Sequence, residues 1–211
     1  GNVVMTRADH ACGTDRCLEA YNAITTPQWR VQNDEQTIII NIQGDEPFIQ
    51  PEQIHALQSC FEDIDGCIET EIATLVKPFT EEDTLEDLEN PNSPKVVFDE
   101  TSHYAMLFSR SVIPYLRNVE KSQWLKAGKH YRHIGMYAYR ADVLAKITTL
   151  KQSNIELCES LEQMRWLENG YKIKVATCNI TSIGIDTPED LENAKKEFFS
   201  RQIPLKSNIQ F

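Results

Sequence analysis

The chain has 211 residues, of which 41% are hydrophobic and 25% are charged, and this balance excludes disordered and collagen-like proteins. At roughly 150 residues per domain the length corresponds to one domain, which at this size buries roughly 70% of its unfolded surface. The 21 basic and 32 acidic residues give a net charge of −11. That charge argues against non-specific DNA binding, which relies on clusters of lysine and arginine.

Cysteine and histidine spacing gives little sign of a zinc site. The six cysteines include no C-x-x-C pair, and they are too sparse for a disulfide-built mini-domain. His130 and His133 have H-x-x-H spacing, for which hydrogen-bonded histidines are the favoured interpretation over zinc ligands. No apolar run reaches the roughly 18 residues needed to span a membrane, and no signal peptide is visible. We therefore expect reduced thiols in a cytoplasmic enzyme.

Predicted helices and strands alternate along the chain, which is typical of an α/β fold. The strand at 37–42 is a β-branched run, which indicates burial on both faces as in a parallel sheet. Ser153 and Glu156 have capping-box spacing and begin a helix that ends near Gly170. The other expected elements are a helix from Thr14 to Pro27, a helix from Pro51, strands at 68–76, 96–98, 104–108, 133–139 and 172–177, and a last helix from Thr187. The acidic stretch 81–89 is interpreted as a solvated helix face, and residues 111–130 as an irregular excursion.

Two acidic positions are candidates for metal binding. Asp45 and Glu46 follow the strand at 37–42, at the sheet edge where α/β proteins bind ligands. A carboxylate there suits Mg²⁺, although a turn aspartate that caps its own loop is the alternative. Asp186 precedes the last predicted helix, where an ordinary helix-entry acid is the alternative.

Two further stretches carry polar groups. Residues 5–16 are rich in polar groups and include Gly13 and a predicted helix start, where free backbone N–H groups suit a base or a phosphate. The alternative is a solvated loop. The helix carrying Glu162, Gln163 and Arg165 is also consistent with a salt-bridged surface.

These stretches together resemble one family. Residues 5–16 resemble the M-T-R-x-D-H-x-S-G-T-E/D-R block of 3-deoxy-manno-octulosonate cytidylyltransferases, the CMP-Kdo synthetases, and 43–47 resemble their Q-G-D-E-P segment. Four further motifs follow in the family's order: Phe108-Ser109-Arg110 with Ile113-Pro114, Arg132 to Gly135 with Tyr137, Leu161-Glu162-Gln163, and Gly184 to Leu191. The resemblance covers Val4 to about Lys196.

The resemblance implies a nucleotide-diphospho-sugar transferase fold, with a mixed sheet between helices, and a homodimer whose contacts involve residues 111–130. It implies a reaction that joins CTP to the acidic sugar 3-deoxy-manno-octulosonate (Kdo), giving CMP-Kdo and pyrophosphate for lipopolysaccharide synthesis. The site residues carried over are Asp45 and Asp186 for Mg²⁺; Gln43, Arg110, Arg117, His133, Tyr137, Glu162 and Gln163 for the sugar; and Arg7, Ala8 and Gly13 for the nucleotide. The guanidinium of Arg110 is a bidentate fork that suits the sugar carboxylate.

Two departures from the family pattern lead to further expectations. Cys12 stands where the family has serine. The family's phosphate-gripping loop, P-A-R-x-x-S-x-R-L-P-G-K-P-L, has no counterpart here, so we expect a single domain over 1–211 that is incomplete at its amino terminus. The alternatives are a related acidic sugar, namely sialic acid or an amino-substituted Kdo, and a catalytically silent fragment.

Overall fold

The protein is described here from a computed structural model. The structure describes residues 3–44, 46, 48–62, 69–180, 191, 192 and 195. Asp45 and Asp186, and most of the helix expected from Thr187, lie outside the described residues.

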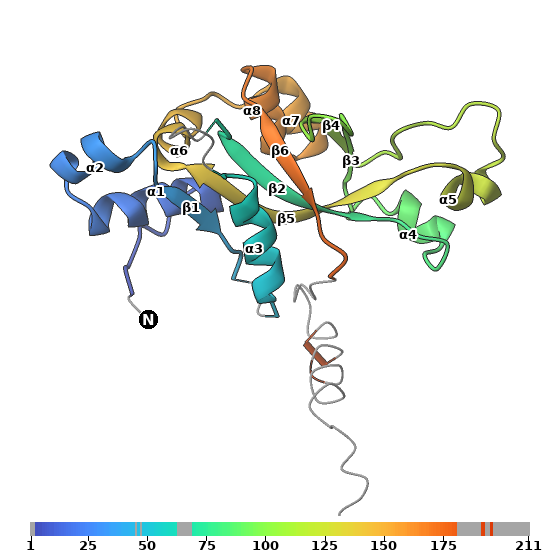
Figure 1. The fold of residues 1–211 in the computed structure, drawn as a ribbon, viewed down its shortest axis with the longest axis horizontal. Coiled ribbons are helices and arrows are strands. Elements are labelled where there is room, and N and C mark those ends of the chain that lie inside the picture. Colours follow the sequence, from blue (N-terminus) through green and yellow to red (C-terminus); the bar gives the residue numbers. More distant parts are fainter. Residues whose placement is uncertain are drawn as a thin grey trace, which may run out of the picture.

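Six strands form one mixed sheet. Their order is β4-β3-β5-β2-β6, with β1 also paired to β5; β2 and β6 are parallel, and the other pairs are antiparallel. Figure 1 shows β5 running through most of the length of the molecule, so that it contacts β1 near one end and β3 near the other. The strands are β1 (Ile38–Asn41), β2 (Ile72–Pro78), β3 (Lys95–Phe98), β4 (Ala105–Ser109), β5 (Tyr131–Arg140) and β6 (Ile173–Thr177).

Helices cover both faces of this sheet, which confirms the predicted mixed sheet between helices. Leu57 of α3 packs with Leu75 and Ala138 on one face, and α6 and α8 pack on the other through Leu144 and Trp166. The helices are α1 (Gly13–Ile24), α2 (Pro27–Asn33), α3 (Pro51–Ser59), α4 (Leu85–Glu89), α5 (Trp124–Ala127), α6 (Ala141–Ile147), α7 (Asn154–Glu159) and α8 (Gln163–Glu168), with a 3-10 turn at Lys121–Gln123.

An irregularity in β5 shapes the site described below. Thr74 of β2 pairs with Tyr137, whereas the next residue, Leu75, pairs with Ile134. Two extra residues of β5 therefore oppose one step of β2. Because side chains alternate between the faces with a period of two, an insertion of two residues preserves the alternation. His133 and Tyr137 thus share the sheet face of Thr74.

Two predictions about these elements were wrong, and one needs an addition. β1 is half-buried along most of its length and pairs antiparallel with β5, because a β-branched run indicates burial but not strand direction. The helix expected to end at Pro27 does stop before it, at Ile24, and Pro27 begins the further helix α2, since a proline fits the first turn of a helix. The helix expected from Ser153 to Gly170 has its predicted capping box, but it breaks at Ser160, which has φ 49°.

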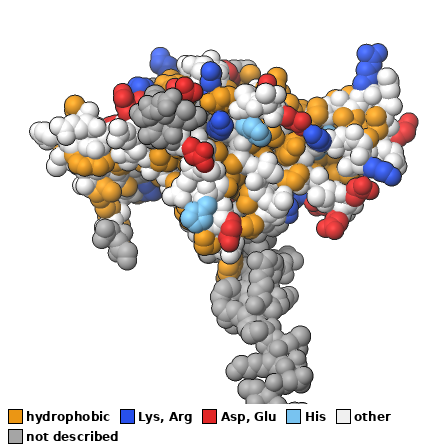
Figure 2. Space-filling view, viewed as in Figure 1, with side chains coloured by type: hydrophobic (Ala, Val, Ile, Leu, Met, Phe, Trp, Pro, Cys, Tyr) orange, Lys and Arg blue, Asp and Glu red, His pale blue; other side chains and the backbone are white. Residues whose placement is uncertain are grey.

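The excursion at 111–130 is more ordered than the sequence predicted. It contains the 3-10 turn and α5, and Trp124 packs with Phe79 and Leu88 in a small separate core. His130 Nε2 lies 3.1 Å from the carbonyl oxygen of Pro114, as favoured for a hydrogen-bonded histidine. The second half of the acidic stretch forms α4, and acidic side chains gather in this region in Figure 2.

Two observations bear on the earlier expectations about thiols and membranes. The cysteines in the described part of the chain are all free thiols. Within the same residues, none of the helices has both the length and the apolar character needed to cross a membrane.

Candidate active site

The candidate site lies where β1 ends beside β5. Asn41, the last residue of β1, pairs with Tyr137, and Gln43 follows two residues later with its Nε2 3.5 Å from Asn41 Oδ1. Gly13 approaches from α1: a Cβ added there would lie 3.0 Å from Gln43 Nε2. The helix start predicted to bind nucleotide is therefore packed against the strand end predicted to bind sugar.

Glu162 connects the same helix start to α8. Its carboxylate accepts hydrogen bonds from Thr14 Oγ1 at 2.9 Å, from Cys12 Sγ at 3.2 Å and from Arg165 Nη2 at 2.5 Å. Burial, aided by the nearby Glu162 charge, raises the pKa of Cys12 to about 11, so this thiol stays protonated and remains a donor at neutral pH. Glu162 is thus held by three protein donors, two of them from the predicted nucleotide segment.

His133 is held on three sides within the same sheet face. Its Nε2 lies 2.9 Å from Thr74 Oγ1, and its ring meets Phe108 edge-on at 5.1 Å and Tyr137 at 5.3 Å. Its backbone N–H donates to the Pro94 carbonyl at 2.8 Å. Burial lowers the pKa of His133 to about 4, so the imidazole is neutral at pH 7.

Several polar atoms of the site are buried without a partner among the described residues. They are Tyr137 Oη, Gln163 Nε2 and Glu46 Oε2. A buried polar atom without a hydrogen bond costs about 1–3 kcal/mol, so such atoms are expected where a ligand supplies the missing partner. A cavity of about 370 Å³ opens beside His133, and Glu46, Lys77, Asn92, Pro94, Arg132 and Gly135 also line it.

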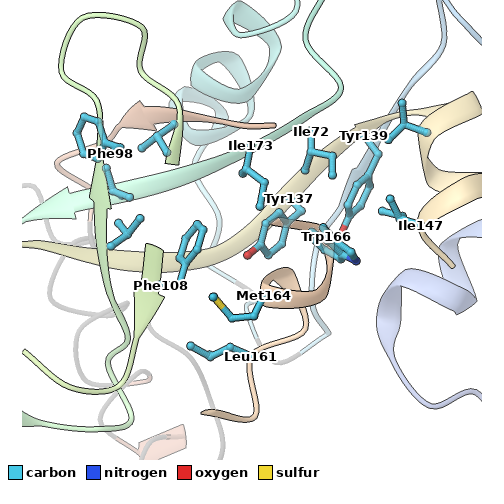
Figure 3. Close-up of a cluster of buried hydrophobic side chains, with 14 of the residues drawn as sticks. Ile72, Phe98, Phe108, Tyr137, Tyr139, Ile147, Leu161, Met164, Trp166 and Ile173 are labelled. Carbon is cyan, nitrogen blue, oxygen red and sulfur yellow. The ribbon is translucent and has the colours of Figure 1, made fainter. Parts of the chain in front are cut away.

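The rings of Tyr137, Tyr139 and Trp166 pack together and form what we call the aromatic wall of the site. Trp166 of α8 meets Tyr137 at 5.1 Å and Tyr139 at 5.7 Å, both nearly edge-on. Figure 3 shows the three rings together between β5 and α8. Tyr139 Oη lies 3.4 Å from Thr14 Oγ1, so the wall also contacts the start of α1. Burial raises the pKa of both tyrosines, which keeps their hydroxyls protonated.

The guanidinium of Arg110 donates hydrogen bonds to three backbone carbonyls. Its Nε donates to Glu159 O at 2.5 Å, its Nη2 to Ser160 O at 3.2 Å and its Nη1 to Pro91 O at 2.8 Å. Two of these carbonyls belong to the end of α7, where helices leave such groups unsatisfied. Three of the five guanidinium N–H groups are therefore used within the chain, and two remain for a ligand.

The other predicted contacts lie on exposed loops. Arg7 and Ala8 are exposed before α1, and Arg7 Nε lies 3.0 Å from Asp9 Oδ1. Arg16 holds this loop by donating to Thr6 Oγ1 and to the Arg7 carbonyl. Arg117 is exposed in the loop between β4 and α5, which stands away from α1 and α2 in Figure 1.

The predicted metal ligands, Asp45 and Asp186, lie outside the described residues. In the part of the chain that is described, no group of three or more His, Cys, Asp or Glu side chains is placed to hold a metal ion. Glu46, the next residue in the sequence, has a buried Oε2 without a partner among the described residues, and Mg²⁺ takes carboxylate oxygens of this kind.

Comparison with known proteins identifies the family. The family profile described as cytidylyltransferase matches residues 1–173. A 3-deoxy-manno-octulosonate cytidylyltransferase of Phocaeicola vulgatus is 55% identical over 202 residues, covering 96% of this chain and 74% of that protein. This chain belongs to the 3-deoxy-manno-octulosonate cytidylyltransferase family. The cytidylyltransferases of that name from Bacteroides thetaiotaomicron and Porphyromonas gingivalis are 54% and 50% identical, covering 93% and 92% of this chain and 73% and 71% of those proteins.

A solved cytidylyltransferase structure agrees with the fold. CMP:2-keto-3-deoxy-manno-octonic acid synthetase complexed with CTP matches with a TM-score of 0.78 and 34% identity, covering 95% of this chain and 73% of that one. The expected nucleotide-diphospho-sugar transferase fold is thereby confirmed for this family member.

The site contains residues that sequence reasoning missed. Thr74, Phe108 and Trp166 each contact a predicted sugar residue, and Arg165 holds Glu162. Phe108 begins one of the motifs that carry the family resemblance, and Arg165 lies in the helix noted for Glu162 and Gln163. This closeness to predicted site residues was the signal that could have identified both. Thr74 lies inside a predicted strand, and nothing in its local pattern distinguishes it from a core residue.

Proposed function

We propose that the protein catalyses the Mg²⁺-dependent transfer of CMP from CTP to Kdo, releasing pyrophosphate, as a step in lipopolysaccharide synthesis. One observation carries the proposal: Thr14, in the predicted nucleotide segment, is bonded at 2.9 Å to Glu162, in the predicted sugar motif. The two substrates of such a transfer must meet, and this contact joins the two predicted half-sites. The names of the relatives and the CTP complex of the structural neighbour support it.

At the nucleotide end we assign Arg7, Ala8 and Gly13 to the cytosine and ribose. Gly13 begins α1, where unpaired backbone N–H groups point out of the helix. Its lack of a Cβ allows the close approach to Gln43. Gln43 is therefore available to contact the sugar directly beside the nucleotide.

At the sugar end we assign Gln43, Arg110, Arg117, His133, Tyr137, Glu162 and Gln163. The neutral imidazole of His133 and the protonated hydroxyl of Tyr137 suit sugar hydroxyls, and the unpartnered Gln163 Nε2 is a donor of the same kind. The two remaining N–H groups of Arg110 suit the sugar carboxylate. Glu162, already bonded to three protein donors, orders the site as well as contacting substrate.

We assign Asp45 and Asp186 as the residues that hold Mg²⁺. When bound there, the cation screens the phosphate charges and lowers the pKa of the attacking sugar hydroxyl. The chain itself excludes water with the aromatic wall of Tyr137, Tyr139 and Trp166. Because the transfer needs no covalent enzyme intermediate, positioning and electrostatic stabilisation supply most of the rate.

We also propose that the enzyme acts in the cytoplasm as a homodimer. The excursion at 111–130 is the segment assigned to the dimer contact. It lies at the end of the molecule opposite α1 and α2 in Figure 1, and Tyr115 within it is 72% exposed.

The experiment that tests the proposal measures pyrophosphate release from CTP with Kdo, 8-amino-Kdo, sialic acid or no sugar, with and without Mg²⁺. We expect release only with Mg²⁺ and a sugar, and fastest with Kdo. Asp45→Asn and Asp186→Asn should each remove most turnover, whereas the exposed Glu81→Gln should not. Full activity in both aspartate variants would refute the metal assignment, and preference for sialic acid would refute the sugar.

A further inference from the structure

Thr74 lies at the centre of the irregularity in β5. Its side chain is fully buried, and its Oγ1 lies 2.9 Å from His133 Nε2, 2.9 Å from Met136 O and 3.3 Å from Ile134 O. The two carbonyls converge on this hydroxyl because the two extra residues of β5 turn the backbone away from its regular ladder with β2.

The proton count around Thr74 fixes the direction of the bond to His133. A threonine hydroxyl has one hydrogen and two lone pairs, and a carbonyl oxygen only accepts. If Thr74 gave its hydrogen to His133, Met136 O would face Oγ1 at 2.9 Å with no hydrogen between the two oxygens. The satisfied arrangement has Thr74 donating to a carbonyl and His133 Nε2–H donating to Thr74.

This direction determines what His133 offers to a ligand. In a neutral imidazole one nitrogen donates and the other accepts. With Nε2 protonated, Nδ1 carries the lone pair. The side-chain hydrogen bond of His133 among the described residues uses Nε2, and His133 lines the cavity of about 370 Å³. The imidazole ring is not free to flip and interchange the positions of Nδ1 and Nε2. Phe108 and Tyr137 pack against the ring, and the Pro94 carbonyl fixes the backbone of His133 by accepting its N–H.

We propose that Thr74 is a positioning residue that holds His133 in the Nε2–H tautomer, so that Nδ1 accepts a hydrogen bond from a hydroxyl of the sugar. The inference rests on the proposed function for its sugar half only. The tautomer itself is a property of the free chain. A hydroxyl is thereby selected at this position over a group that can only accept, since an acceptor would meet the lone pair of Nδ1.

The first test uses the free wild-type protein. Long-range ¹H–¹⁵N correlation spectra of the histidine rings, with His133 assigned by its absence in His133→Asn, report which nitrogen carries the proton. We expect a single Nε2–H tautomer at pH 7 in the wild type and in Thr74→Ser. Thr74→Val should give a mixture or the Nδ1–H form. A wild-type Nδ1–H form, or an unchanged tautomer in Thr74→Val, would overturn the role of Thr74.

The second test measures steady-state kinetics. Loss of one oriented hydrogen bond predicts a rise of about tenfold in KM for Kdo in Thr74→Val. The kcat and the KM for CTP should stay within about twofold of wild type, since a positioning residue acts here on sugar binding. Thr74→Ser should restore the KM. Thr70→Val is the matched control, because Thr70 is also buried and donates to a backbone carbonyl, that of Cys60, away from His133.

The two tests separate the inference from the proposed function. If Kdo neither binds nor reacts while the wild-type tautomer is Nε2–H, the sugar half of the proposal fails together with the proposed function, and the role of Thr74 stands. If Kdo reacts normally but Thr74→Val leaves the KM for Kdo unchanged, the inference fails and the proposed function stands.

Discussion

Thr14 Oγ1 donates a 2.9 Å hydrogen bond to Glu162 Oε2, joining the first turn of α1 to the residue before α8. The two residues are 148 positions apart in the chain. Around this bond, Cys12 and Arg165 complete the donor set of the Glu162 carboxylate. The predicted nucleotide and sugar segments therefore share one charged hydrogen-bond network, and disturbing it affects both.

Glu162→Gln should lower both stability and turnover. The variant replaces a carboxylate that accepts from three donors by an amide that offers one acceptor oxygen, and it leaves the buried Arg165 with a weaker partner. We expect the free energy of unfolding to fall by about 1–3 kcal/mol. Urea titration measures this. Glu81→Gln, on an exposed side chain, should change it by less than about 0.5 kcal/mol. Equal stability of the two variants would refute the network.

Gly13→Ala should weaken the binding of Kdo and leave the stability of the protein nearly unchanged. The added Cβ meets Gln43 Nε2 at 3.0 Å and Asn41 Nδ2 at 3.3 Å, and both are ends of side chains that can move. Because alanine favours helix over glycine, unfolding free energy should stay within about 1 kcal/mol of wild type. The displaced Gln43 should raise the KM for Kdo about tenfold. An unchanged KM would show that the Gly13 approach does not position Gln43.

Arg110→Ala should destabilise the protein even without substrates. The guanidinium donates to the carbonyls of Pro91, Glu159 and Ser160, and their loss should lower the unfolding free energy by about 2–3 kcal/mol. Lysine, which lacks the planar fork, should recover only part of this. Thermal unfolding of the ligand-free variants is the measurement. If Arg110 served only the sugar, both variants would unfold like wild type.

Stability should fall as the pH drops from 7 to 5. Burial lowers the pKa of folded His133 to about 4, against an unfolded value near 6.5. The unfolded state therefore binds the proton more readily. The stabilisation from the neutral ring is present above pH 6.5 and is lost as the pH falls toward 4. Between pH 7 and 5 the linkage amounts to about 2 kcal/mol.

The same pH range allows a matched comparison. His133→Asn should lose less stability than wild type between pH 7 and 5 when both are unfolded in urea. The remaining decline in the variant has a source in His130, whose pKa is also lowered by burial. Identical pH profiles for variant and wild type would contradict the buried neutral state of His133.

The sequence predicted local features better than tertiary ones. The Ser153 capping box and the strand at 133–139 depend on near neighbours, and both are present. The break at Ser160 was missed because its left-handed conformation is stabilised from outside the helix, by Arg110 bonding to the Ser160 carbonyl. The antiparallel pairing of β1 with β5 was missed because a run of β-branched residues indicates burial but not the direction of the neighbouring strand.

The site shows a similar division. The segments that carry Gly13, Gln43 and Glu162, assigned to the substrates by resemblance, meet near the end of β1. Their supporting residues could not be found this way. Thr74 acts only through the irregular pairing of β2 with β5, and Trp166 through its packing on two tyrosines. Neither arrangement leaves a periodic signature in the chain.

Identification of the reaction product tests the proposed CMP transfer to Kdo most directly. The protein is incubated with CTP, Kdo and Mg²⁺, and the mixture is followed by ³¹P NMR and mass spectrometry. We predict a sugar phosphodiester with the mass of CMP-Kdo, formed in equal amount to pyrophosphate, and no product when Kdo is left out. Pyrophosphate release without Kdo, or a phosphodiester formed only with another acidic sugar, would contradict it.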